Sequence, residues 1–135
     1  MSRSGPTGRF PREARIRERW EFNRIHQEAP SVHTGSFTVL ALPCLAGARP
    51  RLGCAISKKV GGAVVRNRIR RWVREVFRAR QQQLPPVDLV VVAKPEASAL
   101  PALINLEAEL GPAFDQVAAR AMAGQRRRGK VERKK

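Results

Sequence analysis

The stretch SKKVGGAVVRNRIRRWVREVFR, Ser57 to Arg78, restricts the fold of this chain more than any other segment. After the Gly61–Gly62 pair, its apolar residues recur at helical spacing, and at about 100° per residue they fall in a stripe roughly 100° wide. The stripe consists of Val65, Ile69, Trp72, Val73 and Val76, with Phe77 at its margin. We therefore expect an amphipathic helix that packs this stripe on a sheet and exposes its other face.

The exposed face of that helix is almost entirely basic. Nine Lys and Arg residues lie between Lys58 and Arg80, and Glu75 is the single acid among them. The 135-residue chain has a formal net charge of +16, and it is close to neutral apart from this segment and the two termini. Such a concentration of charge indicates a polyanionic partner, because a solvated helix normally mixes acids with its bases. A basic solvated face without a specific ligand is the alternative.

Composition divides the chain into three parts. Residues 1–12, rich in Gly, Pro, Ser and Arg, are predicted to be a flexible basic N-terminal arm, and residues 124–135 a disordered basic tail. Residues 13–123 are predicted to form a single domain, which is long enough for one hydrophobic core.

The elements of this domain predict an α+β fold with one sheet packed on helices. In chain order they are a helix at 13–26, strands at 36–43 and 51–57, the basic helix, a buried strand at 88–93 and a helix at 101–123. The short connection between the first two strands suggests an antiparallel hairpin. The Gly111–Pro112 pair should kink or split the last helix, because proline removes a hydrogen bond and clashes with the preceding turn.

No set of residues indicates catalysis or metal binding by the protein itself. The two histidines, His26 and His33, lie in different predicted elements, and no phosphate-cradling glycine loop is present. The acids are scattered, and Asp88 is expected to be solvated or to cap. Cys44 and Cys54 lack metal-ligand spacing and are expected to be buried thiols in a reducing compartment.

The hydropathy pattern indicates a cytoplasmic protein without a membrane partner. No apolar run approaches the roughly 18 residues of a membrane span, and the N-terminus lacks an apolar signal region.

The basic helix is the first candidate surface for nucleic acid. An arginine presents a planar fork that donates two hydrogen bonds to a phosphate, and it also stacks on bases. Helical spacing places Arg66 and Arg68 beside the apolar stripe, and the residues expected on the opposite side are Asn67, Arg70, Arg71, Arg74 and Arg78. The Lys58–Gly62 loop precedes the helix N-terminus, whose free N–H groups attract anions.

The predicted sheet supplies a second candidate surface. Thr38 and Leu40 alternate to one face of their strand. If the first helix lies across that face, Phe22 and His26 form a groove with them. A shallow groove with aromatic rings suits unstacked single-stranded RNA. Core packing is the alternative role for Phe22.

The segment from Ser57 to Arg78 closely resembles the signature region of the bacterial ribonuclease P protein subunit, above all in its Arg66–Asn67–Arg68 element. The likeness extends to RERWEFNRIHQEAPSVHTGSFTVLALP, which is similar to the first helix and following strand of that family. It continues in DLVVVAKPEA, which looks like the family's last strand, and covers roughly residues 15–120.

This resemblance implies a two-layer split β-α-β sandwich with a four-stranded sheet and a left-handed crossover. It also implies a protein that pairs, expected one to one, with a large catalytic RNA. That RNA removes the 5′ leader of precursor tRNA with Mg²⁺, so the holoenzyme is an endoribonuclease whose catalytic centre lies in the RNA. No cofactor is expected to be held by protein residues.

Site residues carried over from the family fall into two groups. Contacts with the catalytic RNA are implied for Lys58, Lys59, Arg66, Asn67, Arg68, Arg70, Arg71 and Arg74. Contacts with the leader are implied for Phe22, His26, Thr38 and Leu40. The chain departs from the family at His26, where a second aromatic ring is frequent, and at Leu40, where a tyrosine can stand.

Two other functions remain open at this point. A ribosomal or RNA-chaperone protein that binds structured RNA would explain the charge equally well. A free-standing protein nuclease would need an acid–base or metal constellation, which the chain does not show.

Overall fold

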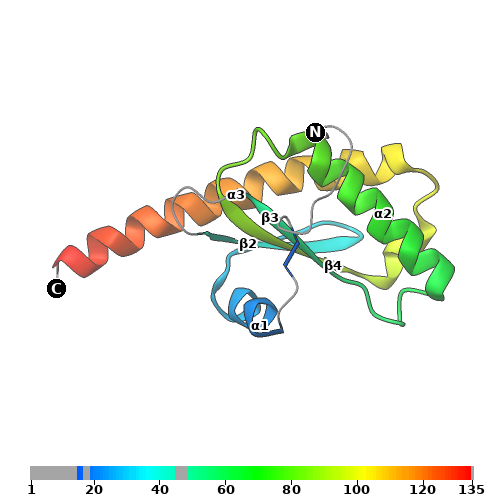
Figure 1. The fold of residues 1–135 in the computed structure, drawn as a ribbon, viewed down its shortest axis with the longest axis horizontal. Coiled ribbons are helices and arrows are strands. Elements are labelled where there is room, and N and C mark those ends of the chain that lie inside the picture. The colour runs from blue at the N-terminus through cyan, green and yellow to red at the C-terminus, as the bar shows by residue number, and fades with distance from the viewer. Residues whose placement is uncertain (1–14, 17–18, 45–48, 135) are drawn as a thin grey trace, which may run out of the picture.

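The computed structural model describes residues 15–16, 19–44 and 49–134, with residues 125–134 as backbone only. The predicted N-terminal arm, 1–12, lies outside the described residues. The elements are α1 (Arg19–Glu28), β1 (Ser31–His33), β2 (Phe37–Pro43), β3 (Arg51–Ala55), α2 (Ala63–Arg80), β4 (Val87–Ala93), the 3-10 helix η2 (Pro95–Ala99) and α3 (Leu103–Lys134). The fold is α+β, as the sequence predicts (Figure 1).

The four strands form one mixed sheet in the order β1-β2-β4-β3. β4 pairs antiparallel with β2 and parallel with β3, so the predicted hairpin between the strands at 36–43 and 51–57 is wrong. The physical reason lies in β4, whose sequence VDLVVVA lacks polar alternation. A strand that is apolar on both faces is most stable in the middle of a sheet covered on both sides. The hairpin in this fold joins β1 and β2.

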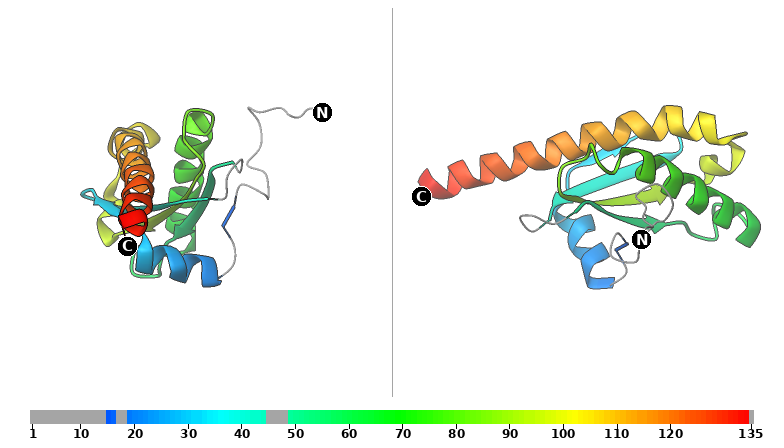
Figure 2. Two further views of the ribbon diagram at one scale, coloured as in Figure 1. Left: turned by 90° about the vertical axis from the view of Figure 1, so that its left-hand side faces the viewer. Right: turned by 45° about the horizontal axis from the view of Figure 1, so that its top comes forward.

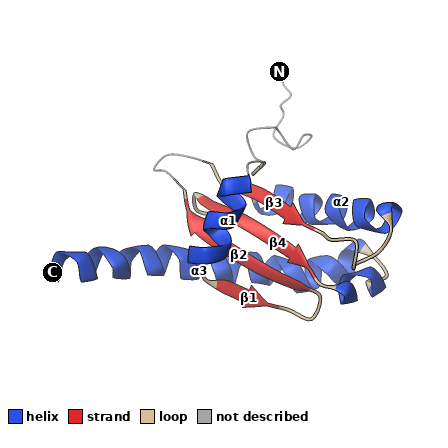
Figure 3. Ribbon diagram, turned by 90° about the horizontal axis from the view of Figure 1, so that it is seen from below, coloured by secondary structure: helices blue, strands red, loops and turns tan. Residues whose placement is uncertain are grey.

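The connection from β3 through α2 to β4 has an uncommon hand. In Figure 3, β3 and β4 run parallel, and α2 lies on the far side of the sheet. The chain passes from the edge strand to α2 and back to the neighbouring inner strand as a left-handed crossover, against the strong right-handed preference of such units.

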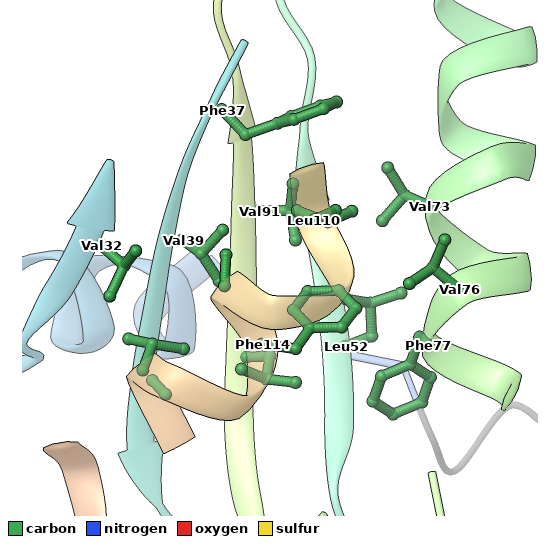
Figure 4. Packing of buried hydrophobic residues seen from close by; sticks show 14 of the residues in the cluster. Val32, Phe37, Val39, Leu52, Val73, Val76, Phe77, Val91, Leu110 and Phe114 are labelled. Atoms are coloured by element: carbon green, nitrogen blue, oxygen red, sulfur yellow. The ribbon is translucent and has the colours of Figure 1, made fainter. Parts of the chain in front are cut away.

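The larger core lies between the sheet and the layer formed by α2 and α3 (Figure 4). The predicted stripe of α2 faces this core, with Ile69, Val73 and Val76 buried. Phe77 is fully buried as well, and its ring meets that of Phe114 edge to face, with 6.4 Å between the ring centroids. This layer and the sheet together form the predicted two-layer sandwich.

The opposite face of the sheet is covered by α1, which crosses it at one end (Figures 2 and 3). A second, smaller cluster forms there from Ile16, Ile25, Leu40, Leu42 and Val90. Only the part of this face near the C-terminal end of β2 and the start of β4 lies under the helix, so side chains further along the strands remain half-buried.

The first helix begins later than predicted. The structure starts α1 at Arg19, and Ile16, three residues earlier, donates a backbone hydrogen bond of 2.8 Å to the carbonyl of Leu52. Arg15 and Leu52 thereby form a parallel bridge along β3. The residues predicted as the first helical turns include a segment that protects the free edge of the sheet.

The last helix is neither split at Pro112 nor ended before the tail. α3 continues through Pro112 to Lys134, across the stretch predicted to be disordered. Pro112 and Ala108 are both exposed, so solvent can hydrate the carbonyl of Ala108 that proline leaves without a helical donor. The apolar side of the helix, including Leu110 and Phe114, remains in the core.

Candidate RNA interface

The basic side of α2 and the loop before it combine exposed and half-buried side chains. Lys58, Lys59, Asn67 and Arg71 are exposed. Half-buried cations lie along the margins of the helix, namely Arg66, Arg68, Arg70 and Arg74. Within the part of the chain that the structure describes, Arg66, Arg68, Arg70 and Arg71 form no ion pair with an acid.

Three of these half-buried arginines, Arg66, Arg68 and Arg70, are held by neutral groups. Arg66 donates from Nε to the carbonyl of Gly61 at 3.1 Å, and Arg70 donates to the Oδ1 atom of Asn67 at 3.0 Å. Arg68 lies over the ring of Trp72, with 5.2 Å between its Cζ atom and the ring centroid. These contacts orient the guanidinium groups and leave their charges without a neutralising carboxylate, which suits a phosphate partner.

The arginines of α2 do not all lie on one face of the helix. Arg66 and Arg68 flank the apolar stripe, as helical spacing predicts. The sequence predicts that Arg70 and Arg74 lie on the side of α2 opposite the apolar stripe and point away from the domain. In the structure they instead line a pocket of about 210 Å³ beside β3. The other lining residues are Arg15, Ile16, Phe22, Leu52, Gly53 and Cys54.

This pocket has positive charge and no carboxylate among its lining residues. Burial lowers the pKa of Arg74, and the neighbouring charges of Arg15 and Arg70 add to the lowering. Burial raises the pKa of the Cys54 thiol to about 11, so the thiol is neutral at physiological pH. The lining therefore presents guanidinium groups to an anion.

Phe22 forms the wall of the pocket opposite α2. The Cζ atom of its ring would lie 2.7 Å from a Cβ at position 53, so the ring occupies space that only glycine leaves open. The ring is half-buried and packs against the smaller core cluster. The structure therefore brings Phe22 together with Arg70 and Arg74, which the sequence placed on two separate surfaces.

The remaining groove residues have different environments. Thr38 is half-buried, and its Oγ1 atom is hydrogen-bonded to Nδ1 of His33 at 3.0 Å. His26 is exposed on α1 and donates from Nδ1 to the carbonyl of Phe22 at 2.9 Å. Leu40 is only 6% exposed and packs beneath α1, so its expected place on the open surface of the groove is wrong.

Two further residues lie on the same sheet face, and sequence reasoning did not place them there. Val92 pairs with Thr38 across β2 and β4, and Ala55 pairs with Val92 across β4 and β3. Both are half-buried and lie beyond the part of the sheet under α1. The lack of polar alternation in β4 was the sequence signal that could have placed Val92 and Ala55 on this face. A strand that is apolar on both sides is expected in the middle of the sheet, here between β2 and β3.

A network of charges joins α1 to the sheet next to Phe22. Arg51 donates from Nε and Nη2 to the two carboxylate oxygens of Asp88 at 2.8 and 2.9 Å, and from Nη2 to Glu21 at 2.7 Å. The hydrogen bonds to Asp88, followed by the one to Glu21, raise the pKa of Arg51. Asp88 is 3% exposed, so its predicted solvated role is wrong.

The described residues contain no cluster of three or more His, Cys, Asp or Glu side chains that could hold a metal ion. Cys44 and Cys54 are free thiols, both partly buried. None of the described helices combines the length and the apolar character that crossing a membrane requires.

The fold and this site define a class: a small α+β protein in which an arginine-rich helix and an aromatic side chain line one cationic pocket, as expected for a partner with phosphates and bases. Comparison with known proteins agrees. The family model described as Ribonuclease P matches residues 10–118. The chain belongs to the ribonuclease P protein family, the protein component of a ribonucleoprotein of tRNA processing.

Individual relatives are similar along most of the chain. The ribonuclease P protein component of Desulfovibrio desulfuricans is 46% identical over 90 residues, which are 65% of this chain and 69% of the relative. That of Citrifermentans bemidjiense is 38% identical over 108 residues, covering 80% and 91%. These relatives favour the ribonuclease P assignment over the ribosomal or chaperone alternative.

Solved structures of the family share the fold. The Staphylococcus aureus RNase P protein superposes with a TM-score of 0.71 at 29% identity, covering 76% of this chain and 93% of that one. The Thermotoga maritima RNase P protein gives a TM-score of 0.69 at 29% identity, covering 76% and 96%.

Proposed function

We propose that this chain binds the catalytic RNA of ribonuclease P and the 5′ leader of precursor tRNA, and so promotes endonucleolytic removal of the leader. Contacts with the catalytic RNA are assigned to Lys58, Lys59, Arg66, Asn67, Arg68, Arg70, Arg71 and Arg74. Contacts with the leader are assigned to Phe22, His26 and Thr38, with Leu40 supporting them from beneath α1.

The observation that carries this proposal is the pocket shared by Phe22, Arg70 and Arg74. A strand that stacks a base on Phe22 can bring its phosphates to the arginines of α2, and the same helix carries further cations toward a folded RNA. Base–aromatic stacking and phosphate contacts are the two terms that dominate single-strand binding.

In this proposal the protein supplies affinity and positioning, while the RNA and its Mg²⁺ ions hydrolyse the phosphodiester bond. Leader contacts favour precursor over mature tRNA, because only the precursor carries that strand. Arginines placed among crowded phosphates lower the Mg²⁺ concentration that the RNA requires. We infer a one-to-one complex in the cytoplasm.

The test is reconstitution of the holoenzyme from the purified chain and its catalytic RNA. Cleavage is measured with and without protein, across Mg²⁺ concentrations and with leaders of one and of several nucleotides. The expected result is a lower Mg²⁺ requirement and a larger gain for the longer leader. A protein-dependent gain that is the same for both leaders contradicts the positioning role.

Two further measurements separate this function from the others. RNA that co-purifies after nuclease-protected pulldown should be the catalytic RNA, whereas ribosomal RNA would indicate a ribosomal protein. Cleavage of precursor tRNA by the purified protein alone, with no RNA present, would point to a protein nuclease.

A further inference from the structure

Arg51 lies where α1, β3 and β4 meet, next to the pocket but outside its lining. We propose that Arg51 is a positioning residue for leader binding: through Glu21 and Asp88 it holds α1 at the orientation in which Phe22 lies over Gly53. This inference rests on the proposed function, because it concerns the aromatic wall of the leader site.

The geometry couples Arg51 directly to the position of Phe22. Glu21 immediately precedes Phe22 on α1, and its Oε2 atom is 2.7 Å from Nη2 of Arg51. Arg51 and Gly53 are two residues apart on β3, so they share one face of the strand. The joint between α1 and the sheet edge therefore has two adjacent contacts, one ionic at Arg51 and one aromatic at Gly53.

The ionic contact has a direction that the apolar contacts of α1 lack. The fork of Arg51 donates to both carboxylate oxygens of Asp88 and also to Glu21, which defines its plane. Ile25 of α1 and Leu40 of β2 belong to one apolar cluster, but hydrophobic contact is non-directional and tolerates sliding. A small rotation of α1 would preserve that burial but move the ring of Phe22 away from its position over Gly53.

The burial of these charges indicates that the network serves to orient α1 more than to stabilise the fold. The side chain of Asp88 is 5% exposed, that of Glu21 15% and that of Arg51 28%. Removing such charges from water offsets much of their mutual attraction, and apolar replacements of buried ion pairs are often as stable. A network of this kind is retained more readily where a defined geometry is needed.

The experiment compares holoenzymes reconstituted with the wild-type chain, Arg51→Met and Arg51→Lys. Each is assayed on precursor tRNA with a leader of several nucleotides and with a leader of one. For Arg51→Met the KM of the long-leader substrate should rise roughly tenfold, toward that of the short one, a loss within the range of one stacked base. Its kcat, its KM for the short leader and its affinity for the catalytic RNA should stay within about twofold of wild type.

The lysine variant separates positioning from simple charge. Lys retains the positive charge but cannot bridge two carboxylates with a planar fork, so Arg51→Lys should recover only part of the long-leader KM. The matched control is Asp115→Asn, which breaks the ion pair between Arg80 of α2 and Asp115 of α3. That pair lies away from α1, so this variant should keep the full difference between the two leaders.

The outcomes distinguish the inference from the proposed function. If the wild-type holoenzyme shows no dependence on leader length, the proposed function fails. If the wild-type and Arg51→Met holoenzymes depend equally on leader length, the positioning role is overturned. It is also overturned if Arg51→Met raises the KM values of the long-leader and short-leader substrates alike. Should Arg51→Met fail to fold by circular dichroism, Glu21→Gln decides by the same criterion, because it removes one arm of the network and leaves the buried pair of Arg51 and Asp88.

Discussion

The two faces of the sheet are built differently. Toward α2 and α3, the β2 residues Phe37 and Val39 are fully buried in a large apolar core. Toward α1, the alternating β2 residues are Leu40 and Leu42, which are buried, and Thr38, which is half-buried and hydrogen-bonded to a histidine. One strand thus contributes to a closed face and to a partly open one.

This difference indicates that one face of the sheet mainly stabilises the fold and the other mainly carries the binding residues. The α2–α3 face holds the larger of the two buried apolar clusters, so most of the hydrophobic stabilisation comes from it. The α1 face can then retain features that cost stability: a nearly buried ionic network and a pocket lined by three arginines. The predictions below test this division, in order of decreasing effect.

The largest effect is expected on the closed face. Phe114→Ala removes a fully buried ring that meets Phe77 edge to face, so the free energy of unfolding should fall by about 3–5 kcal/mol. Urea denaturation followed by circular dichroism measures this loss. If Ile25→Ala, in the smaller cluster, costs as much or more, the proposed division between the faces is wrong.

Phe22→Ala should act on substrate binding more than on the fold. Loss of one stacked base weakens affinity for leader-bearing precursor tRNA by about 1–3 kcal/mol, while affinity for mature tRNA stays unchanged. Fluorescence binding to the holoenzyme measures both constants. Phe22→Leu, which keeps apolar bulk over Gly53, serves as the control for lost packing and should also weaken precursor binding. Equal weakening for precursor and mature tRNA would assign Phe22 to the core.

Arg70→Ala should weaken assembly with the catalytic RNA by about 1–3 kcal/mol, because it removes a charge-assisted phosphate contact. The hydrogen bond between Arg70 and Asn67 is exposed, so the melting temperature should change little. Arg24→Ala removes an equal charge from α1, where Arg24 pairs with Glu28, and is the control. A similar loss in both variants would mean that total charge, and not the position on α2, determines assembly.

The smallest effect concerns Cys54 at the edge of the pocket. Burial raises the pKa of its thiol from 9.0 to about 11, so the folded state binds the proton more tightly than the unfolded state does. This contribution is fully present below pH 9 and is lost as the pH rises from 9 to 11. Denaturation at pH 8, 9, 10 and 11 should show that decline, with a shallower one in Cys54→Ala. Parallel declines in both proteins would show that the thiol does not contribute.

Local features of the sequence predicted much of the fold. The stripe of α2 was predicted correctly because helical periodicity depends on residues within one element, and Ile69 and Val73 are indeed buried. The strand at 88–93 was also found. The sheet order was not, because the position of β4 between β2 and β3 depends on contacts between distant segments.

The site shows the same division between local and distant information. The spacing on α2 identified its arginines, but it did not show that Arg70 and Arg74 meet Phe22, which comes from another helix. Likewise, Asp88 was expected to be solvated, since its partner Arg51 lies 37 residues earlier in the chain. Leu40 was placed in the groove because alternation gives the face of a residue but not the extent to which α1 covers it.

The central place of β4 has a consequence for synthesis on the ribosome. β4 pairs with both β2 and β3, yet it is the last strand to be translated. A nascent chain that ends before residue 87 can form the β1–β2 hairpin, but β3 has no neighbouring strand except the segment at Arg15 and Ile16. The sheet therefore closes only late in translation, and until then β2 and β3 expose strand edges that can associate with other chains.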